Sequence, residues 1–245
     1  MRLTRVFVPD ALSPGTEIAL PDGAAAHLTR VLRLGVGDAC IVFNGDGHDY
    51  TASIATVGKR EARLRIGEAT PVERESPLRL VLLQGVAKGE KMDLILQKAT
   101  ELGVHAIVPV WSQRSDVKLD GDRAAKRLEH WRSVVASACE QCGRAMVPAV
   151  AAPVSLQSAL AAAELPATRL LLDPQGVHAL PSMSIEPTAG IAIAVGPEGG
   201  WSPLDREQLR AAGFEGLRLG PRILRTETAG LAAIAALQAR FGDLA

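Results

Sequence analysis

The run Ile191-Ala192-Ile193-Ala194-Val195, followed at once by Gly196-Pro197-Glu198-Gly199-Gly200, indicates the class of fold. A short apolar run bounded by glycine and proline is typical of a strand that is buried on both faces of a sheet. The next residues, Ser202-Pro203-Leu204-Asp205, have the form of a helix N-cap, a first-turn proline and an acid at the third position. A buried strand, a glycine-rich turn and a capped helix together predict a parallel α/β sheet.

The same alternation extends from residue 78 to the end of the chain. We expect strands at residues 78–84, 105–110, 169–172, 191–195 and 217–219, and helices at 88–102, 122–142, 156–163, 203–212 and 226–241. In such a fold, ligands bind in the crevice beyond the carboxyl ends of the strands. The last helix is apolar nearly all round, so it must be covered on every side, either by this domain or by a second subunit.

The first 70 residues follow a different pattern. Short apolar or alternating runs at residues 5–8, 38–43, 48–56 and 61–67 predict strands, with one helix at 24–34. The stretch Asn44-Gly45-Asp46-Gly47 is a strong hairpin signal. We therefore expect a small β-barrel domain at 1–70, a linker rich in Glu and Arg at 71–77, and an α/β domain at 78–245.

The composition excludes several classes of protein. With 47% apolar and 22% charged residues, the 245-residue chain is neither disordered nor fibrous. Its apolar runs are far shorter than the roughly 18–20 residues of a membrane span. Three cysteines fit a reducing compartment, and no apolar stretch of signal-peptide length is present near the amino terminus, so we expect a cytoplasmic protein. The 27 basic and 27 acidic residues balance, so any nucleic-acid binding must depend on local clusters.

The turn at residues 196–200 lies where a ligand-binding loop belongs, because glycines let backbone groups approach a ligand closely. The turn lacks the G-x-G-x-x-G pattern of dinucleotide folds and the lysine of a Walker loop, which disfavours NAD and ATP. A tight strand–helix connection without a ligand is the alternative.

A second cluster runs from Leu219 to Thr228 and again follows a strand and opens a helix. It combines two arginines, two hydroxyls and a carboxylate with apolar neighbours, which is typical of a small-molecule pocket. The alternative is local: Thr226 or Thr228 caps the helix, and Glu227 lies favourably in its first turn. Both interpretations can hold together.

Two further patterns have structural and functional interpretations. Cys139 and Cys142 have the spacing of a metal or redox pair, but with only Cys40 besides them we favour simple helix packing. His27, Arg30 and Arg33 recur every third residue and could bind phosphate or form a solvated helix face.

The helix expected at 88–102 carries lysines and acids at alternating positions, which we interpret as ordinary surface pairs. These residues are Lys88, Lys91 and Lys98 with Glu90, Asp93 and Glu101.

Together, these stretches resemble the RsmE family of ribosomal RNA small-subunit methyltransferases, which belongs to the SPOUT superfamily. The matching pieces, in chain order, are His27–Leu34, Gly89–Met92, Gln97–Val104, Cys139–Arg144, Gly196–Gly200 and Leu219–Thr228. The resemblance covers essentially the whole chain, and the last two pieces are the most specific. It implies a PUA-like β-barrel that binds RNA, followed by a SPOUT α/β domain with a C-terminal trefoil knot, and a homodimer formed through that domain.

The resemblance also implies methylation of a uridine at N3 in small-subunit ribosomal RNA, with S-adenosylmethionine as cofactor and without a metal. The implied cofactor-binding residues are Leu172, Gly196, Pro197, Glu198, Gly199, Gly200, Leu219, Gly220, Ile223, Leu224 and Thr226. We therefore expect the turns at 196–200 and 219–228 to meet in one pocket. The RNA, free or in the assembled subunit, is expected to contact Arg2, Arg5, His27, Arg30 and Arg33.

Uridine N3 carries a proton, so its methylation needs a base or a cation that stabilises the anion. We expect Glu227 to act as the base and Arg114 or Arg225 to stabilise charge on the uracil. Structural alternatives are a helix cap for Glu227 and a phosphate contact for Arg114. A non-catalytic RNA-binding or ribosome-assembly factor with a vestigial α/β domain is the alternative function, and a cofactor-binding measurement separates the two.

Overall fold

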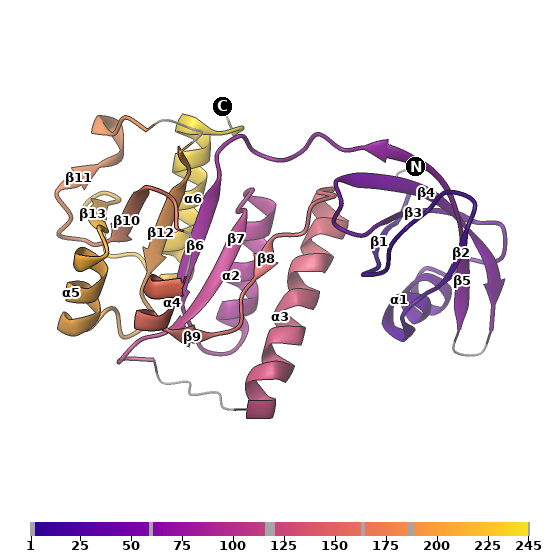
Figure 1. The fold of residues 1–245 in the computed structure, drawn as a ribbon, viewed down its shortest axis with the longest axis horizontal. Coiled ribbons are helices and arrows are strands. Elements are labelled where there is room, and N and C mark those ends of the chain that lie inside the picture. Colours follow the sequence, from indigo (N-terminus) through magenta and orange to yellow (C-terminus); the bar gives the residue numbers. More distant parts are fainter. Residues whose placement is uncertain (1–2, 59–60, 116–120, 163–164, 186–188, 245) are drawn as a thin grey trace. The chain divides into compact units, whose positions relative to one another are not determined.

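A computed structural model describes residues 3–58, 61–115, 121–162, 165–185 and 189–244. The chain folds into two compact units (Figure 1). Unit 1 comprises residues 1–75 and 136–147, and unit 2 comprises residues 76–135 and 148–245. The division between Glu75 and Ser76 falls within the stretch expected as the linker. No local pattern indicates that residues 136–147, which include the end of a long helix, belong with the amino-terminal unit.

Within its described residues, unit 1 contains a five-stranded sheet. The strands, in spatial order, are β1 (Arg5–Phe7), β3 (Ala39–Phe43), β4 (His48–Val57), β5 (Ala62–Pro71) and β2 (Glu17–Ala19). β1 pairs with β3 in parallel and the other pairs are antiparallel. The expected hairpin joins β3 to β4, with Gly45 at φ +95° and Gly47 at φ +90°. β5 buries Ala62, Leu64 and Ile66 and exposes the arginines between them, as the period of a strand requires.

The structure differs from the single helix expected at 24–34. An α-helix, α1 (Asp22–Ala26), continues directly as a π-helical turn, η1 (His27–Val31). The wide turn is closed by the Leu32 N–H, which donates to the His27 carbonyl at 3.0 Å. It buries Leu28 while His27 and Arg30 stay exposed. Arg33, just after the turn, has φ +59°, a left-handed conformation that is uncommon for a residue other than glycine.

The described part of unit 2 contains an eight-stranded sheet in which every pair is parallel. The spatial order is β11 (His178–Ala179), β13 (Glu215–Arg218), β10 (Thr168–Leu172), β12 (Ile191–Val195), β6 (Leu80–Gly85), β7 (Ala106–Trp111) and β8 (Ala149–Val150), and β9 (Val154–Ser155) pairs with β7. The predicted α/β class is confirmed. The strands that the sequence did not predict, β8, β9 and β11, have two residues each.

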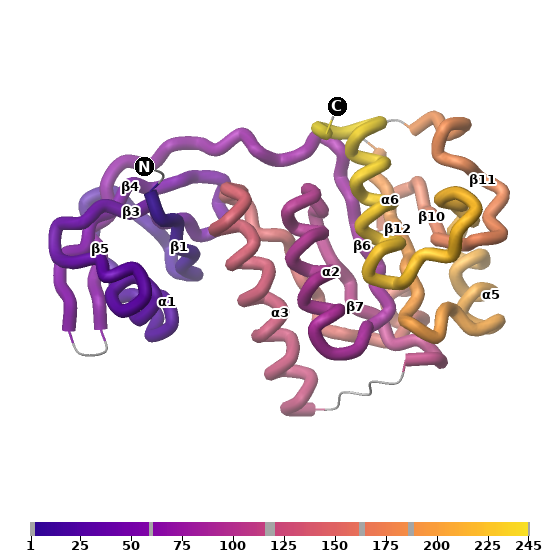
Figure 2. The backbone as a smooth tube through the Cα atoms, turned by 180° about the vertical axis from the view of Figure 1, so that it is seen from behind, coloured from indigo at the N-terminus to yellow at the C-terminus, as the bar shows by residue number. Residues whose placement is uncertain are grey.

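Helices cover both faces of this sheet. The helices given by the described residues from 90 onward are α2 (Glu90–Glu101), α3 (Gly121–Cys142), α4 (Leu156–Ala162), η2, a 3₁₀ turn (Leu180–Ser182), α5 (Pro203–Ala211) and α6 (Thr226–Phe241). α4 and α5 pack on one face, where Leu156 and Leu209 join a cluster with Ala192 and Ala194 of β12. α2 and α6 lie on the opposite face, in front of the sheet in Figure 2. Because β12 lies between these layers, all five of its residues are buried.

No helix among the described residues combines the length and apolar character that crossing a membrane requires.

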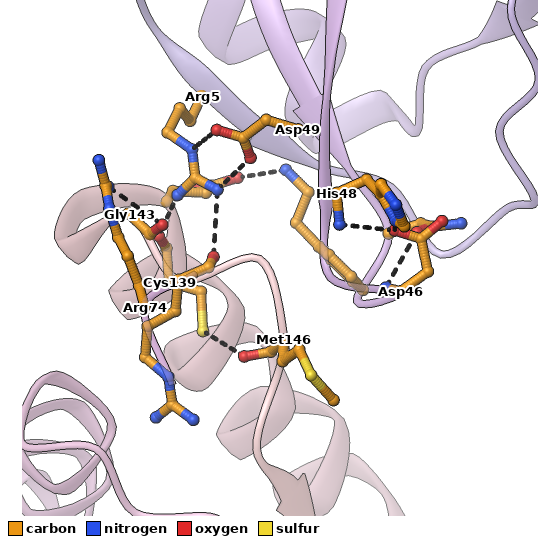
Figure 3. Close-up of polar contacts among 12 residues, drawn as sticks. Arg5, Asp46, His48, Asp49, Arg74, Cys139, Gly143 and Met146 are labelled. Atoms are coloured by element: carbon orange, nitrogen blue, oxygen red, sulfur yellow. Dashed lines mark hydrogen bonds and ion pairs between the residues drawn. The ribbon is translucent and has the colours of Figure 1, made fainter. Parts of the chain in front are cut away.

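The last part of α3 is fastened to the β-sheet of unit 1 by Arg5 (Figure 3). The Arg5 guanidinium donates to both oxygens of Asp49, at 2.5 and 3.2 Å, and to the backbone carbonyls of Cys139 and Arg144, at 2.7 and 3.1 Å. It also stacks over the Phe43 ring at 4.4 Å. The side chain of Arg5 is only 3% exposed, so its donors are engaged inside the unit. This placement argues against the expected contact between Arg5 and RNA, and we propose an internal structural role for Arg5 instead.

Candidate active site

A cavity of about 420 Å³ opens at the carboxyl ends of β10, β12 and β13. This volume lies within the range of small-molecule sites, about 300–1,000 Å³. Loops after the three strands, the first turn of α2 and the first turn of α6 form its walls. Among the described lining residues is every expected cofactor-binding residue except Gly199, together with Glu227 and Arg225 but not Arg114. The structure thus brings the turns at 196–200 and 219–228 together around one space.

The turn after β12 is shaped by close backbone packing. A Cβ atom on Gly85, at the end of β6, would lie 2.5 Å from the backbone nitrogen of Pro197, so only glycine fits there. The Gly200 N–H donates to the Pro197 carbonyl at 2.8 Å, and Gly200 has φ +68°, which favours glycine. The turn therefore has a fixed backbone that faces the cavity.

The predicted helix start after this turn is confirmed in detail. The Ser202 hydroxyl accepts from the Asp205 N–H at 3.0 Å, and the Asp205 carboxylate accepts from the Ser202 N–H at 2.9 Å. With Pro203 in the first turn, this is a complete capping box. The helix α5 can therefore begin immediately after the ligand-facing turn.

A hydrogen-bond relay ties the two turns to each other. The Thr226 hydroxyl donates to the Gly196 carbonyl at 2.5 Å and accepts from the Gln84 amide at 3.1 Å. Gln84 is fully buried in β6. The expectation that Thr226 caps its helix is wrong: the N-cap is Arg225, which makes no described side-chain cap bond, and the Thr226 hydroxyl reaches across to the other turn.

The loop after β10 forms a further wall. Asp173, nearly buried, pairs with Arg206 of α5 and accepts from the Gln175 N–H at 3.0 Å. Gly176 packs against Gly216 of β13, where a Cβ atom would lie 2.5 Å from backbone. Asp173 and Arg206 line the cavity, and neither was among the expected cofactor residues. Asp173 and Arg206 lie 33 positions apart in the sequence, so no local pattern indicates that they pair.

Charged side chains gather at one side of the cavity. Lys91, from the first turn of α2, has its Nζ 3.3 Å from an oxygen of Glu198 and 3.9 Å from Oε2 of Glu227. In the described part of the chain, this Glu227 oxygen is buried and has no hydrogen-bond partner. Buried carboxylate oxygens are rarely left in this state, so an incoming donor is the natural partner. Lys91 was expected to be an ordinary surface residue.

Arg114 lies beside the turn after β12, outside the described lining of the cavity. Its guanidinium donates to the Gly199 carbonyl at 3.1 Å, and its own backbone lies 3.2 Å from where a Gly199 Cβ would be. Arg114 and Gly199 are thus joined to each other, whereas Arg225 is exposed at the cavity edge. Of the two arginines considered for charge stabilisation, the geometry favours Arg225.

Of the residues expected to contact RNA, His27, Arg30 and Arg33 are exposed together on unit 1, around the π-helical turn. Arg2 lies outside the described residues. The three-residue spacing of these side chains was the sequence signal for the cluster. In the structure, all three are exposed in one segment in and just after the π-helical turn.

The cysteines are positioned as packing residues. Burial raises the pKa of the Cys139 thiol to about 12 and that of the Cys40 thiol to about 11, so both stay uncharged. The Cys139 thiol lies 3.8 Å from the Met146 carbonyl, inside unit 1 (Figure 3). Among the described residues, no three His, Cys, Asp or Glu side chains gather as a metal site would require.

Comparison with known proteins defines the class first. Residues 74–238 match the family described as RNA methyltransferase domain, and residues 20–67 match the RNA methyltransferase PUA domain. The two matches define an RNA methyltransferase architecture with an amino-terminal PUA domain.

Full-length relatives narrow the class. The Buchnera aphidicola (subsp. Acyrthosiphon pisum) protein named ribosomal RNA small subunit methyltransferase E is 30% identical, over 99% of this chain and 95% of its own. The Bacillus subtilis protein of the same name is 34% identical, over 86% and 85%. The chain therefore belongs to the ribosomal RNA small subunit methyltransferase E family, which confirms the resemblance of its motifs.

A solved structure has the same fold throughout. The Neisseria gonorrhoeae ribosomal RNA small subunit methyltransferase E, determined bound to S-adenosyl methionine, superposes with a TM-score of 0.92. It is 41% identical, and the match covers 100% of both chains.

Proposed function

We propose that this protein methylates small-subunit ribosomal RNA with S-adenosylmethionine, and that the methylated atom is N3 of a uridine. The observation that carries the proposal is the meeting of two turns, 196–200 and 219–228, around one cavity that Glu227 also lines, with a carboxylate oxygen that accepts no hydrogen bond from the described residues. The relatives of this chain are named as methyltransferases of small-subunit ribosomal RNA, which supports the class of substrate.

The residues around the cavity fit the cofactor. Leu172, Leu219 and Leu224 offer apolar surface to an adenosine group, and Gly196 and Gly220 leave backbone groups accessible for its polar atoms. When bound, S-adenosylmethionine supplies an activated methyl group on a sulfonium, and no metal is needed. The protein mainly has to position two reactants and shape the electrostatic field around them.

The charged side of the cavity supplies what the acceptor needs. Oε2 of Glu227 accepts the proton that leaves uridine N3, and the nitrogen lone pair then attacks the methyl carbon as the methyl–sulfur bond breaks and S-adenosylhomocysteine leaves. Arg225 stabilises the negative charge that develops on the uracil carbonyls. Arg114 supports the turn through its bond to Gly199. Since N3 is engaged in base pairs in duplex RNA, the target uridine is unpaired or extruded into the cavity.

Unit 1 contacts the RNA backbone through His27, Arg30 and Arg33. Because the chain as a whole carries no net charge, this contact is local, and the substrate is a structured RNA such as the assembled small subunit. The protein acts in the cytoplasm, where ribosomal RNA is assembled.

The carboxyl-terminal half forms a trefoil knot and a homodimer. Support for the knot comes from the resemblance of the motifs to the family. Support for the dimer comes from α6, where Leu231, Ala232 and Ala235 remain half-buried in the single chain although the helix is apolar.

The direct test uses small subunits purified from cells that lack this protein. We expect the wild-type protein and S-adenosylmethionine to produce N3-methyluridine at one position, detected by mass spectrometry of the digested RNA. Calorimetry with S-adenosylmethionine tests the cofactor separately. Cofactor binding without any methylated nucleoside would exclude the reaction, and no binding at all would favour a non-catalytic assembly factor.

The RNA surface gives a second prediction. Replacing Arg30 and Arg33 together by Gln should weaken binding to the small subunit and reduce the slope of log affinity against log salt by about 1.4–1.8, since each phosphate contact contributes about 0.7–0.9. Cofactor affinity should not change. The matched control is the double replacement of Arg63 and Arg65 by Gln, which removes the same charge from β5, where both side chains pair with Glu17. Equal losses in both double variants would show that only net charge matters.

A further inference from the structure

We propose that Lys91 is a positioning residue of the methyl-transfer site: Glu198 holds its ammonium, and the ammonium in turn holds the carboxylate of Glu227 ready to accept a proton. The inference rests on the proposed function, specifically on the role of Glu227.

The first part of the argument is that Glu198 is fixed. Its Oε1 accepts from the Lys88 backbone N–H at 3.1 Å and lies 3.3 Å from the Lys91 ammonium. Burial raises the pKa of Glu198, but the backbone N–H groups of Lys88 and Glu198 itself, together with the Lys91 ammonium, outweigh burial and hold the pKa below its ordinary value. Glu198 is therefore ionised at neutral pH. Its contacts with Lys88 and Lys91 tie the turn at 196–200 to the start of α2. The Lys91 ammonium then has a stable partner on one side.

The second part concerns the distance to Glu227. The Lys91 Nζ lies 3.9 Å from Glu227 Oε2, which is close enough for an ion pair but too long for a hydrogen bond. Attraction therefore restrains the carboxylate while its oxygen has no hydrogen-bond donor among the described residues. Only 17% of the Glu227 side chain is exposed, so water supplies little competing restraint.

The third part is that these contacts are specific to Lys91. Lys98, on the same helix, pairs with Glu101 three residues away at 2.8 Å, as expected for a surface lysine. Lys91 instead reaches two acids from distant segments, on the turn after β12 and at the start of α6. Lys91 lines the cavity, and Lys98 is absent from its described lining. Lys98 is thus a matched control for the loss of one lysine from α2.

The experiment measures single-turnover methyl transfer with saturating cofactor and small subunits. We expect Lys91→Met to slow the transfer step up to about 100-fold, because displacement of a reacting group by about 1 Å can cost this much. Thermal stability and cofactor affinity should stay at wild-type values, and Lys91→Arg should recover part of the rate because a cation remains. Lys98→Met should transfer methyl at the wild-type rate.

Combination with Glu227→Gln distinguishes positioning from a separate contribution. If Lys91 acts through Glu227, Lys91→Met should cause no further loss in a protein that already carries Glu227→Gln. The inference would be overturned if the rate losses of Lys91→Met and Glu227→Gln multiplied in the double variant. An equal rate loss in Lys98→Met, or a loss confined to cofactor affinity in Lys91→Met, would also overturn it. A fully active Lys91→Met would overturn the inference and leave the proposed function standing. An inactive wild-type protein would overturn both.

Discussion

Glu227→Gln should lower the rate of methyl transfer about 10²- to 10⁴-fold, the usual contribution of a positioned general base. Glutamine has the shape of glutamate but cannot take up the proton from uridine N3. Glu227 lines the cavity, and its Oε2 accepts no hydrogen bond from the described residues, so its replacement should leave cofactor binding almost unchanged. Single-turnover rates with small subunits, measured beside cofactor affinity, test both statements.

The pH dependence of this variant provides an independent check. As the pH rises, uridine N3 loses its proton without help, so the rate of Glu227→Gln should climb towards the wild-type rate. Glu207→Gln, an exposed acid on α5, is the control and should behave as wild type. If Glu227→Gln methylates at the wild-type rate at neutral pH, Glu227 has no part in the chemistry and serves only the helix.

Local interactions explain why much of the fold was predictable. The capping box at Ser202 and Asp205 and the two glycines of the hairpin are formed by residues within a few positions of one another. Their signals are therefore complete in short stretches of sequence. The same holds for β12, because an unbroken run of five apolar residues indicates a strand that is buried on both faces of the sheet.

The site was only partly predictable, for an equally physical reason. Glycine-rich turns after strands predicted where the cavity opens, but which side chains line it depends on contacts across the fold. Lys91 resembles a surface lysine until β12 and α6 bring two carboxylates to it. Arg114 follows a strand in the sequence, as a residue of the site would, yet its guanidinium donates to the Gly199 carbonyl beside the cavity.

Arg5 shows the same limit in unit 1 and gives the second large effect. Arg5→Met should destabilise this unit by about 3–5 kcal/mol, as expected when one partner of a buried ion pair is removed. The change strands the carboxylate of Asp49 and removes the Arg5 donor from the carbonyls of Cys139 and Arg144. Faster amide hydrogen exchange in β3, β4 and residues 136–147, measured by mass spectrometry, would report the loss within this unit.

Two further variants separate burial from charge. Arg65→Met also removes an ion-paired arginine, but its side chain is 68% exposed, so the expected loss is below about 1 kcal/mol. Adding Asp49→Asn to Arg5→Met should recover part of the stability, because the stranded charge disappears. The opposite pattern, in which Arg5→Met lowers RNA affinity and leaves hydrogen exchange unchanged, would return Arg5 to the RNA surface. The 3% exposure of its side chain argues for the structural outcome, since a guanidinium that already holds a carboxylate and two carbonyls has little left to offer a phosphate.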